Sequence, residues 1–181
     1  MRTTILGLVI VPLLGLAPAL AECPPGPDTA DTRAALHTEL LNAPDAGEAR
    51  RIAGAIWRVW LQAPNPEAQT LLDTGMARRE AFDFAGAEEV FDALVALCPD
   101  YTEGYNQRAF ARFLRQDYQG SLDDIAIVLN RDPYHFGALS GKALNLFRQG
   151  RVELAHDTIR QALRVHPYLE ERRFLPPEDD I

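Results

Sequence analysis

The stretch VALCPDYTEGYNQRAF, residues 95–110, contains a break in the chain that decides the fold. An apolar run ends at Leu97, Cys98 and Pro99 follow, and a new pattern of large and small residues then begins. Proline cannot continue a helix, and it disfavours helix in the residue before it. The same break recurs in VLNRDPYHFGAL, residues 128–139, and in ALRVHPYLEERR, residues 162–173. The chain therefore stops and restarts in the same way three times.

The breaks recur with a fixed period of 34 residues, which places Pro99, Pro133 and Pro167 in one column. Small residues stand 24 and 12 positions before each proline: Gly75, Ala109 and Ala143, then Ala87, Ser121 and Ala155. Large apolar residues fill further columns: Phe84, Tyr118 and Val152; Phe91, Ile125 and Ile159; Val95, Leu129 and Leu163. Columns of this kind predict one structural unit that is repeated.

Each unit is expected to be a pair of helices. Two helices of about a dozen residues fit into one period, with a turn around Asp83, Asp117 and Arg151 and an end at the proline. The small columns let the two helices approach closely, and the large columns fill the space between them. Because one such hairpin cannot bury its own apolar face, the sequence predicts a stack of hairpins.

These columns resemble the tetratricopeptide repeat. The family's pattern of a large residue, two small residues, an aliphatic or aromatic residue and proline is matched by Tyr105, Ala109, Ser121, Ile125 and Pro133. The resemblance covers three repeats, at residues 68–101, 102–135 and 136–169. It implies an all-α fold, a right-handed superhelical α-solenoid of three helix hairpins.

One column departs from the family pattern. Where the first helix of a repeat commonly carries an aromatic residue, this chain has Arg78, Arg112 and, in the third repeat, Leu146. Two interpretations are open. The arginines either pair with acidic residues on neighbouring helices or face an acidic partner.

Residues 30–67 are expected to form a divergent pair of capping helices at the open end of the solenoid. Trp57 and Trp60 lie on one helical face and stand one period before two apolar residues of the first repeat. The alternative is that the two tryptophans are an exposed anchor for a partner, because tryptophan is favoured at binding hot spots. At the other end, residues 170–181 are expected to form a partial helix and an acidic tail.

The first 21 residues have the layout of a secretory signal peptide. One basic residue precedes an apolar run from Ile5 to Leu16, and small residues stand at the expected cleavage site after Ala21. The apolar run is too short for a good membrane span. We therefore expect a periplasmic protein with a flexible, proline-rich N-terminus at residues 22–29 and no membrane insertion after cleavage.

Two cysteines, Cys23 and Cys98, follow the expected signal peptide. An oxidising compartment permits a disulfide between them, which would tie the N-terminus to the first of the three breaks. The alternative is that Cys98 is only a small buried residue and that Cys23 belongs to a mobile tail.

Composition and motifs argue against catalysis and against nucleic acid. The sequence has 18 basic and 26 acidic residues, a formal net charge of −8, so neither nucleic acid nor an acidic membrane surface is an expected partner. The histidines show no metal-ligand spacing, and no glycine-rich loop could cradle a phosphate. Adjacent carboxylates such as Asp123 and Asp124 point in different directions on a helix. We expect no enzyme activity, no cofactor and no metal.

The resemblance also implies a binding surface. In the family, the first helices line a concave groove that holds peptides, and the matching positions are Leu72, Met76, Arg79, Asn106, Phe110, Phe113, Ser140, Leu144 and Phe147. This groove would be largely apolar, with Asn106 able to hold a peptide backbone. Leu72 and Met76 replace the lysine and asparagine of the family's carboxylate clamp, which argues against a chaperone C-terminal tail as ligand. The alternative is that these residues are core or are covered by the C-terminal segment.

Two functions are compatible with these observations. The first is a periplasmic, non-catalytic interaction module that binds a peptide segment or a helix of another envelope protein in the groove. The second is a structural, self-associating protein, a homodimer that is formed through Tyr168 and Leu169 at the apolar end of the third repeat. The two differ in whether the partner is another protein or a second copy of this chain.

Overall fold

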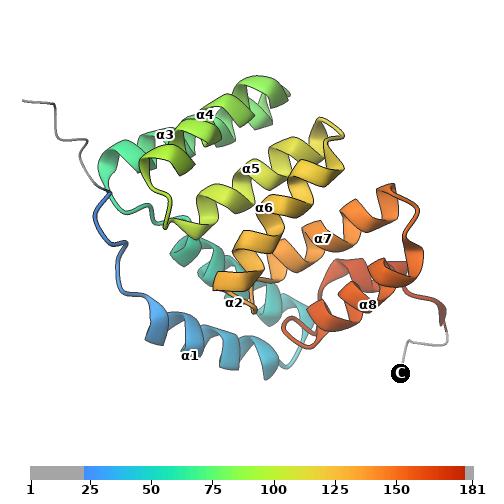
Figure 1. The fold of residues 1–181 in the computed structure, drawn as a ribbon. Helices are drawn as coiled ribbons and strands as arrows, with labels where there is room; N and C mark the ends of the chain where they lie inside the picture. The colour runs from blue at the N-terminus through green and yellow to red at the C-terminus, as the bar shows by residue number, and fades with distance from the viewer. Residues whose placement is uncertain (1–22, 178–181) are drawn as a thin grey trace, which may run out of the picture.

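The computed structural model describes residues 23–177, which form eight α-helices and one short 3₁₀-helix. They are α1 (Ala30–Leu41), α2 (Ala46–Trp60), α3 (Pro66–Glu80), α4 (Phe84–Leu97), α5 (Thr102–Leu114), α6 (Tyr118–Arg131), α7 (Phe136–Arg148), α8 (Val152–Leu163) and η1 (Glu170–Phe174). Figure 1 shows them as successive hairpins, which confirms the predicted all-α class. None of these helices is long and apolar enough to cross a membrane. The expected signal peptide lies outside the described residues.

The three expected repeats are the hairpins α3–α4, α5–α6 and α7–α8. An aspartate caps the second helix of the first two hairpins. Asp83 accepts a hydrogen bond from the backbone N–H of Gly86 at 3.0 Å, and Asp117 accepts one from Gly120 at 3.0 Å. The second helices α4 and α6 each end two residues before the proline of their repeat. The predicted turns and stops of the first two repeats are therefore at the predicted residues, whereas α8 of the third repeat ends four residues before Pro167.

A left-handed residue closes the first helix of every repeat hairpin. The backbone φ angle is 63° at Phe82, 67° at Gln116 and 73° at Gly150, and these positions are spaced by the same 34 residues. Only glycine adopts this region without a steric penalty; a residue with a Cβ atom is destabilised there by about 1–2 kcal/mol. The period therefore extends to the backbone of the turn, although only the third repeat has glycine there.

The small and large columns pack against each other inside each hairpin. A Cβ atom at Gly75 would lie 2.4 Å from Cε1 of Phe91, whose side chain is fully buried. At the same two positions the second repeat has Ala109 and Ile125, and the third has Ala143 and Ile159. In both, alanine replaces glycine and isoleucine replaces the larger phenylalanine. Glycine in the first repeat is thus matched to the size of the phenylalanine ring.

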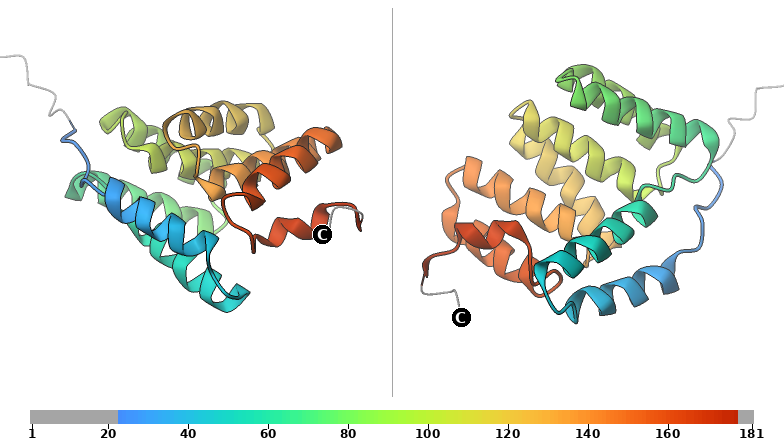
Figure 2. Two further views of the ribbon diagram at one scale, coloured as in Figure 1. Left: turned by 90° about the horizontal axis from the view of Figure 1, so that it is seen from below. Right: turned by 180° about the vertical axis from the view of Figure 1, so that it is seen from behind.

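The N-terminal hairpin, α1 and α2, packs elsewhere than a preceding repeat would. A preceding repeat would stack on α3 and α4, at the open end of the solenoid. Instead, the buried face of α2 shares one apolar cluster with Phe136, Leu139, Ala162 and Val165 of the third repeat. The view from behind in Figure 2 shows α2 and η1 on the same side of the array that α5 and α7 form. The N-terminal hairpin therefore connects the beginning of the chain to its last repeat.

The contacts of Trp60 explain why the N-terminal hairpin packs against the third repeat. Its indole ring stacks on the imidazole of His135, with 3.7 Å between the ring centroids, and its Nε1 donates a hydrogen bond to Asp132 Oδ2 at 3.3 Å. Tyr101 donates its hydroxyl hydrogen to the carbonyl oxygen of Trp60 at 2.9 Å. Arg33 of α1 pairs with the same Asp132 oxygen at 2.8 Å. Trp60 is 7 % exposed, so it binds the turns between repeats and is not an exposed anchor.

The unusual arginines have acidic partners within the chain. Arg112 donates from Nε to Glu88 Oε1 of α4 at 3.0 Å and from Nη1 to Asp124 Oδ2 of α6 at 2.9 Å. Asp124 is 2 % exposed, so this ion pair is largely shielded from water. Arg78 pairs with Asp83 in the turn after α3 at 3.3 Å. Of the two interpretations, internal pairing describes both arginines.

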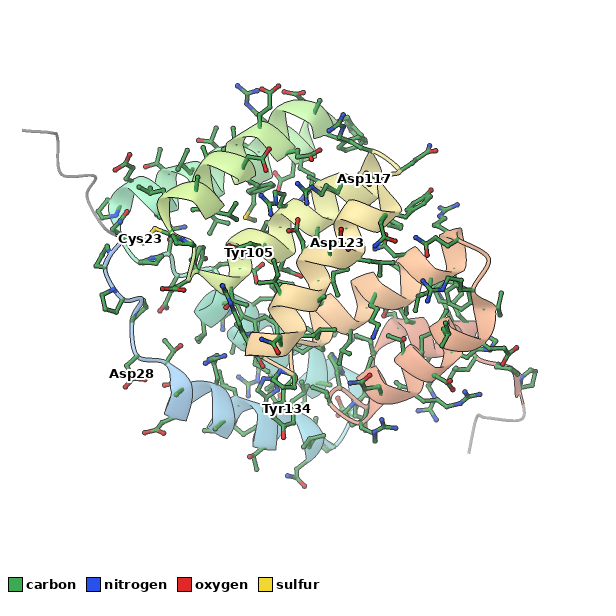
Figure 3. The ribbon with its side chains drawn as sticks, in the orientation of Figure 1. Cys23, Asp28, Tyr105, Asp117, Asp123 and Tyr134 are labelled. Atoms are coloured by element: carbon green, nitrogen blue, oxygen red, sulfur yellow. A yellow bond between two sulfur atoms is a disulfide. The ribbon has the colours of Figure 1, made fainter. Side chains whose placement is uncertain are left out.

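A disulfide joins Cys23 to Cys98. Figure 3 marks Cys23 where the N-terminal segment passes the end of α4. Cys98 is fully buried in the apolar cluster of the first repeat, and residues 24–29 lie outside any helix. The bond closes a loop with a sequence separation of 75, which contains the N-terminal hairpin and the first repeat.

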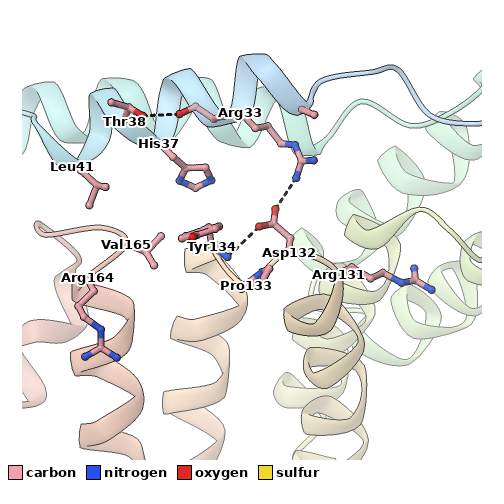
Figure 4. A pocket seen from close by; sticks show the side chains of 12 residues that line it. Arg33, His37, Thr38, Leu41, Arg131, Asp132, Pro133, Tyr134, Arg164 and Val165 are labelled. Carbon is pink, nitrogen blue, oxygen red and sulfur yellow. Dashed lines mark hydrogen bonds and ion pairs between the residues drawn. The ribbon is translucent and has the colours of Figure 1, made fainter.

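A cavity of about 560 Å³ lies between α1 and the turn that precedes α7 (Figure 4). His37 lies there, and neither of its buried ring nitrogens has a hydrogen-bond partner among the described residues. Burial lowers the pKa of His37 and outweighs the opposite effect of Asp132; Arg33 and His135 lower it further. Burial also lowers the pKa of His166. His37, at the contact between the N-terminal hairpin and the repeats, and His166, which packs against Phe136, thus both resist protonation.

Gly75→Ala should lower the free energy of unfolding by about 1–3 kcal/mol, because the added methyl group overlaps Phe91. Chemical denaturation followed by circular dichroism measures the change. Phe91→Ile should cost less in the Gly75→Ala background than in the wild type. Gly54→Ala in α2 is the matched control, since a Cβ there meets only Arg58 at 3.8 Å, and it should be neutral or stabilising. Equal effects of Gly75→Ala and Gly54→Ala would contradict the size matching.

Cys23→Ala should lower the free energy of unfolding by about 2–4 kcal/mol, because the disulfide restricts a long loop of the unfolded chain. Urea denaturation with and without reductant measures this. Reductant should move the wild-type midpoint to that of Cys23→Ala and leave the variant unchanged. Free thiols in the oxidised wild-type protein would show that the bond does not form.

Stability should fall as the pH drops below 6.5, the ordinary pKa of histidine, because His37 and His166 have lowered pKa values in the folded state. The unfolded chain then binds protons that the folded chain rejects. Urea midpoints at pH 7.5 and 5.5 measure the loss, and His37→Gln should reduce it. An unchanged pH dependence in His37→Gln would refute the assignment.

Candidate functional site

A groove of about 490 Å³ lies on the face formed by the first helices of the repeats, α3, α5 and α7. Its volume is within the range of about 300–1,000 Å³ that is usual for ligand clefts. The predicted residues that line it are Met76, Arg79, Asn106, Phe110, Phe113, Ser140 and Leu144. The structure thus brings together residues from all three repeats in one concave surface.

Two residues of the predicted groove lie elsewhere. Leu72 is fully buried in the apolar core of the first repeat, so it points away from the groove surface. Phe147 packs against Phe174 of η1, with 5.7 Å between the ring centroids, and does not line the groove. The alternative interpretation, core or coverage by the C-terminal segment, describes these two residues.

Segments from both ends of the described chain form walls of the groove. From the N-terminal hairpin come Trp57 and Leu61, and the indole of Trp57 lies so close to Gly137 that a Cβ there would be 2.6 Å away. From η1 comes Glu171, which accepts a hydrogen bond from Ser140 Oγ. Phe110 is nevertheless 46 % exposed, so the groove is open to solvent.

Arg79 is the cation of the groove. Its Nη1 donates a hydrogen bond to Gln107 Oε1, and its guanidinium group lies 4.8 Å from the centroid of the Phe110 ring. None of the ion pairs among residues 23–177 includes Arg79. Burial lowers the pKa of Arg79, and this effect exceeds the opposite effects of Glu80 and Glu103. The charge of Arg79 is therefore only partly compensated within the chain.

Asn106 donates one of its two amide hydrogens to a buried carboxylate. Its Nδ2 donates to Glu103 Oε1 at 2.9 Å, and Gln107 Nε2 donates to the same oxygen at 2.5 Å. His135 Nε2 contacts Glu103 Oε2 at 3.0 Å. Since His135 Nδ1 accepts the backbone N–H of Ala138, the ring proton is on Nε2, which donates it to Glu103. Asn106 thus has an internal partner in addition to its place in the groove lining, and its backbone-holding role stays a prediction.

Asn145 is a groove residue that the sequence analysis missed. It is fully buried, and its Nδ2 donates to Ser121 Oγ at 2.9 Å and to the carbonyl oxygen of Gly141 at 2.8 Å. Its Oδ1 has no hydrogen-bond partner among the described residues. One signal was present in the sequence, because the equivalent residues of the other repeats are Ala77 and Ala111. A single polar residue in a column of alanines could have pointed to it.

The groove has the chemistry of a non-covalent binding site. It combines aromatic and aliphatic side chains with one partly compensated cation, one carboxylate and one amide oxygen that lacks a donor. No group of His, Cys, Asp and Glu within residues 23–177 could hold a metal ion.

No family model matches the chain. A TPR repeat-containing protein of Rhizobium etli is 33 % identical over 132 residues, which are 73 % of this chain and 65 % of that protein. The chain therefore spans slightly less than two thirds of that relative's length.

Two solved structures have a similar fold. One is MamA 41-end from Desulfovibrio magneticus RS-1, and the other is the MamA RS-1 ArsTM double mutant. Each has a TM-score of 0.54 and 19 % sequence identity; 81 % of this chain is covered, and 80 % and 79 % of theirs. At that identity the likeness concerns the fold alone. The relative, the fold and the 34-residue helix hairpins agree, and this chain belongs to the tetratricopeptide repeat proteins.

Proposed function

We propose that this protein is a periplasmic, non-catalytic interaction module that binds a segment of another envelope protein in the groove. Tetratricopeptide repeat proteins are in general protein–protein interaction modules. The observation that carries the proposal is the groove itself, which is preformed, open and lined by aromatic side chains. A preformed site favours affinity because little conformational entropy is lost on binding.

Phe110 and Phe113 are the groove residues from which most binding energy is expected. Phe110 is half exposed, Phe113 is partly buried, and both line the groove on α5, between the first and the third repeat. Complete burial of a phenylalanine side chain contributes about 1.5–3 kcal/mol. A partner that covers these rings therefore gains most of its affinity at the centre of the groove.

Two observations support the periplasm as the location. The signal-peptide pattern of the first 21 residues is one. The disulfide between Cys23 and Cys98 is the other, because such bonds persist in oxidising compartments and are rare in the cytosol.

Self-association is the second candidate function. The structure adds apolar residues of α8 to Tyr168 and Leu169 as the surface that a second copy could cover. Tyr168 donates a hydrogen bond to the carbonyl oxygen of Ala43 at 3.3 Å, and Leu169 packs against the chain's own apolar cluster. Tyr168 is nevertheless 39 % exposed, and Val152 and Leu154 of α8 are 43 % and 48 % exposed. Light scattering of the purified mature protein tests this, because a dimer that resists dilution and dissociates in Leu154→Asp would support it.

Phe113→Ala should reduce capture of the partner about tenfold or more, because a central aromatic contact is lost. The measurement is cross-linking in the periplasm followed by quantitative identification of the captured proteins. Phe82→Ala is the matched control: Phe82 is 81 % exposed and lies outside the groove. Circular dichroism should show the same helix content in both variants. Equal capture by Phe113→Ala and Phe82→Ala would exclude the groove as the binding surface.

A further inference from the structure

We infer that the groove selects an extended peptide segment with an acidic residue toward α3, a basic residue toward η1 and an apolar residue between them. This inference rests on the proposed function and adds the chemistry and the orientation of the ligand. It follows from the charges at the two ends of the groove and from the unpartnered oxygen in its floor.

The end of the groove at α3 is positive. Arg79 donates one hydrogen bond to a neutral amide, that of Gln107, and its guanidinium group carries further N–H donors that point in fixed directions. Burial disfavours this charge, and no ion pair within residues 23–177 offsets it. A carboxylate of the ligand would supply the missing countercharge and would form charge-assisted hydrogen bonds.

The end at η1 is negative. Glu171 is partly buried, lines the groove and accepts a hydrogen bond from the neutral hydroxyl of Ser140. It takes part in none of the ion pairs found within the described part of the chain. The helices that line the groove contact one another in the order α3, α5, α7, and η1 packs against α8, the partner of α7. Figure 1 shows α3, α5 and α7 following one another in this order. Arg79 on α3 and Glu171 on η1 therefore stand at opposite ends of the groove, which is electrically polarised along its length.

The floor of the groove favours an extended ligand. Asn145 is fully buried and lines the groove, and its Oδ1 has no donor. A buried acceptor without a donor is costly, so a ligand that supplies an N–H group gains affinity. Within a helix the backbone N–H groups bind carbonyl oxygens of the same helix, whereas an extended segment has them free. A helical partner would leave Asn145 Oδ1 unsatisfied unless a side chain reached it.

The centre of the groove takes an apolar side chain. Phe110, Phe113 and Leu144 line it between the two charged ends. The Arg79 guanidinium covers part of the Phe110 ring, so an acidic residue at Arg79 and an apolar residue on Phe110 would be close neighbours in the ligand. A segment that lay the other way round would bring like charges together at both ends, so the charges fix the direction in which a given segment lies in the groove.

Fluorescence anisotropy with labelled, end-blocked peptides tests this on the mature protein with its disulfide intact. The probes are Glu-Thr-Leu-Thr-Lys, the reverse order Lys-Thr-Leu-Thr-Glu and neutral Gln-Thr-Leu-Thr-Gln, each with the spacing of the charges varied. Both charged peptides should bind about tenfold more tightly than the neutral probe at low salt, because either can place its glutamate at Arg79, and added salt should reduce this advantage. Methylation of the backbone nitrogens around leucine should weaken binding of the charged peptides, because it removes the N–H group that would bind Asn145 Oδ1.

Charge reversal provides the matched variants. Arg79→Glu should abolish the advantage of the charged peptides over the neutral one, and Arg79→Glu with Glu171→Lys should restore it. Arg79→Gln, which removes the charge but keeps hydrogen-bond donors, should reduce that advantage. Thermal denaturation of each variant checks that the fold is intact.

The possible outcomes separate this inference from the proposed function. If all three peptides bind equally and Phe113→Ala weakens each of them, the groove binds peptides and the inferred polarity is wrong. If the N-methylated peptide binds as well as its parent, the extended conformation is wrong. If no peptide binds and Phe113→Ala captures its partner as well as the wild type does, both the inference and the proposed function are overturned.

Discussion

One buried carboxylate connects the separate parts of this structure. Glu103 is 2 % exposed, and it accepts hydrogen bonds from two amides of its own helix and from His135. A charge in the interior is tolerated only where such donors surround it, so these side chains have little freedom. Gln107, one of the amides, accepts a hydrogen bond from Arg79 in the groove. The imidazole ring of His135 stacks on the indole ring of Trp60. The position of a groove cation and the position of the N-terminal hairpin thus depend on the same carboxylate.

This connection makes the protein less modular than a simple repeat array. In a solenoid each repeat contacts only its neighbours, and stability is a sum over neighbouring pairs. Here Trp60 contacts the turns on both sides of the second repeat, through Tyr101 and Asp132, while its helix packs against the third. Trp57 of the same helix forms a wall of the groove. Changes at the N-terminal hairpin are therefore expected to alter the shape of the groove, although the hairpin precedes the repeats that line it.

The sequence predicts the repeated part of the fold well because periodic columns report local packing. The prolines, the helix turns and the columns of small and large residues could all be located from spacing alone, whereas the contact of Gly75 with Phe91 came from the structure. Contacts that do not recur with the 34-residue period could not be predicted from it. Trp60 stands one period before Leu94 and so suggested a stacked preceding repeat, but its partner is His135, which spacing does not connect to it. No spacing singles out Glu103, and only the fold surrounds it with donors. Leu72 occupies a position that lines the groove in the family, but here it is a core residue. Spacing does not distinguish the groove-facing side of a helix from the neighbouring side that faces the core.

The separation of Arg33 from its partner Asp132 is 99 residues, and it has a consequence for how the chain reaches its final form. Hairpins with local contacts can form as soon as their residues are available, whereas contacts between distant residues form slowly. The first helices to be synthesised therefore acquire their docking site only after most of the chain has been made. For the same reason the array has a fixed length. Duplication of an internal repeat would move His135 away from Trp60 and leave the N-terminal hairpin without its partner, so the docked hairpin limits the number of repeats that the array can contain.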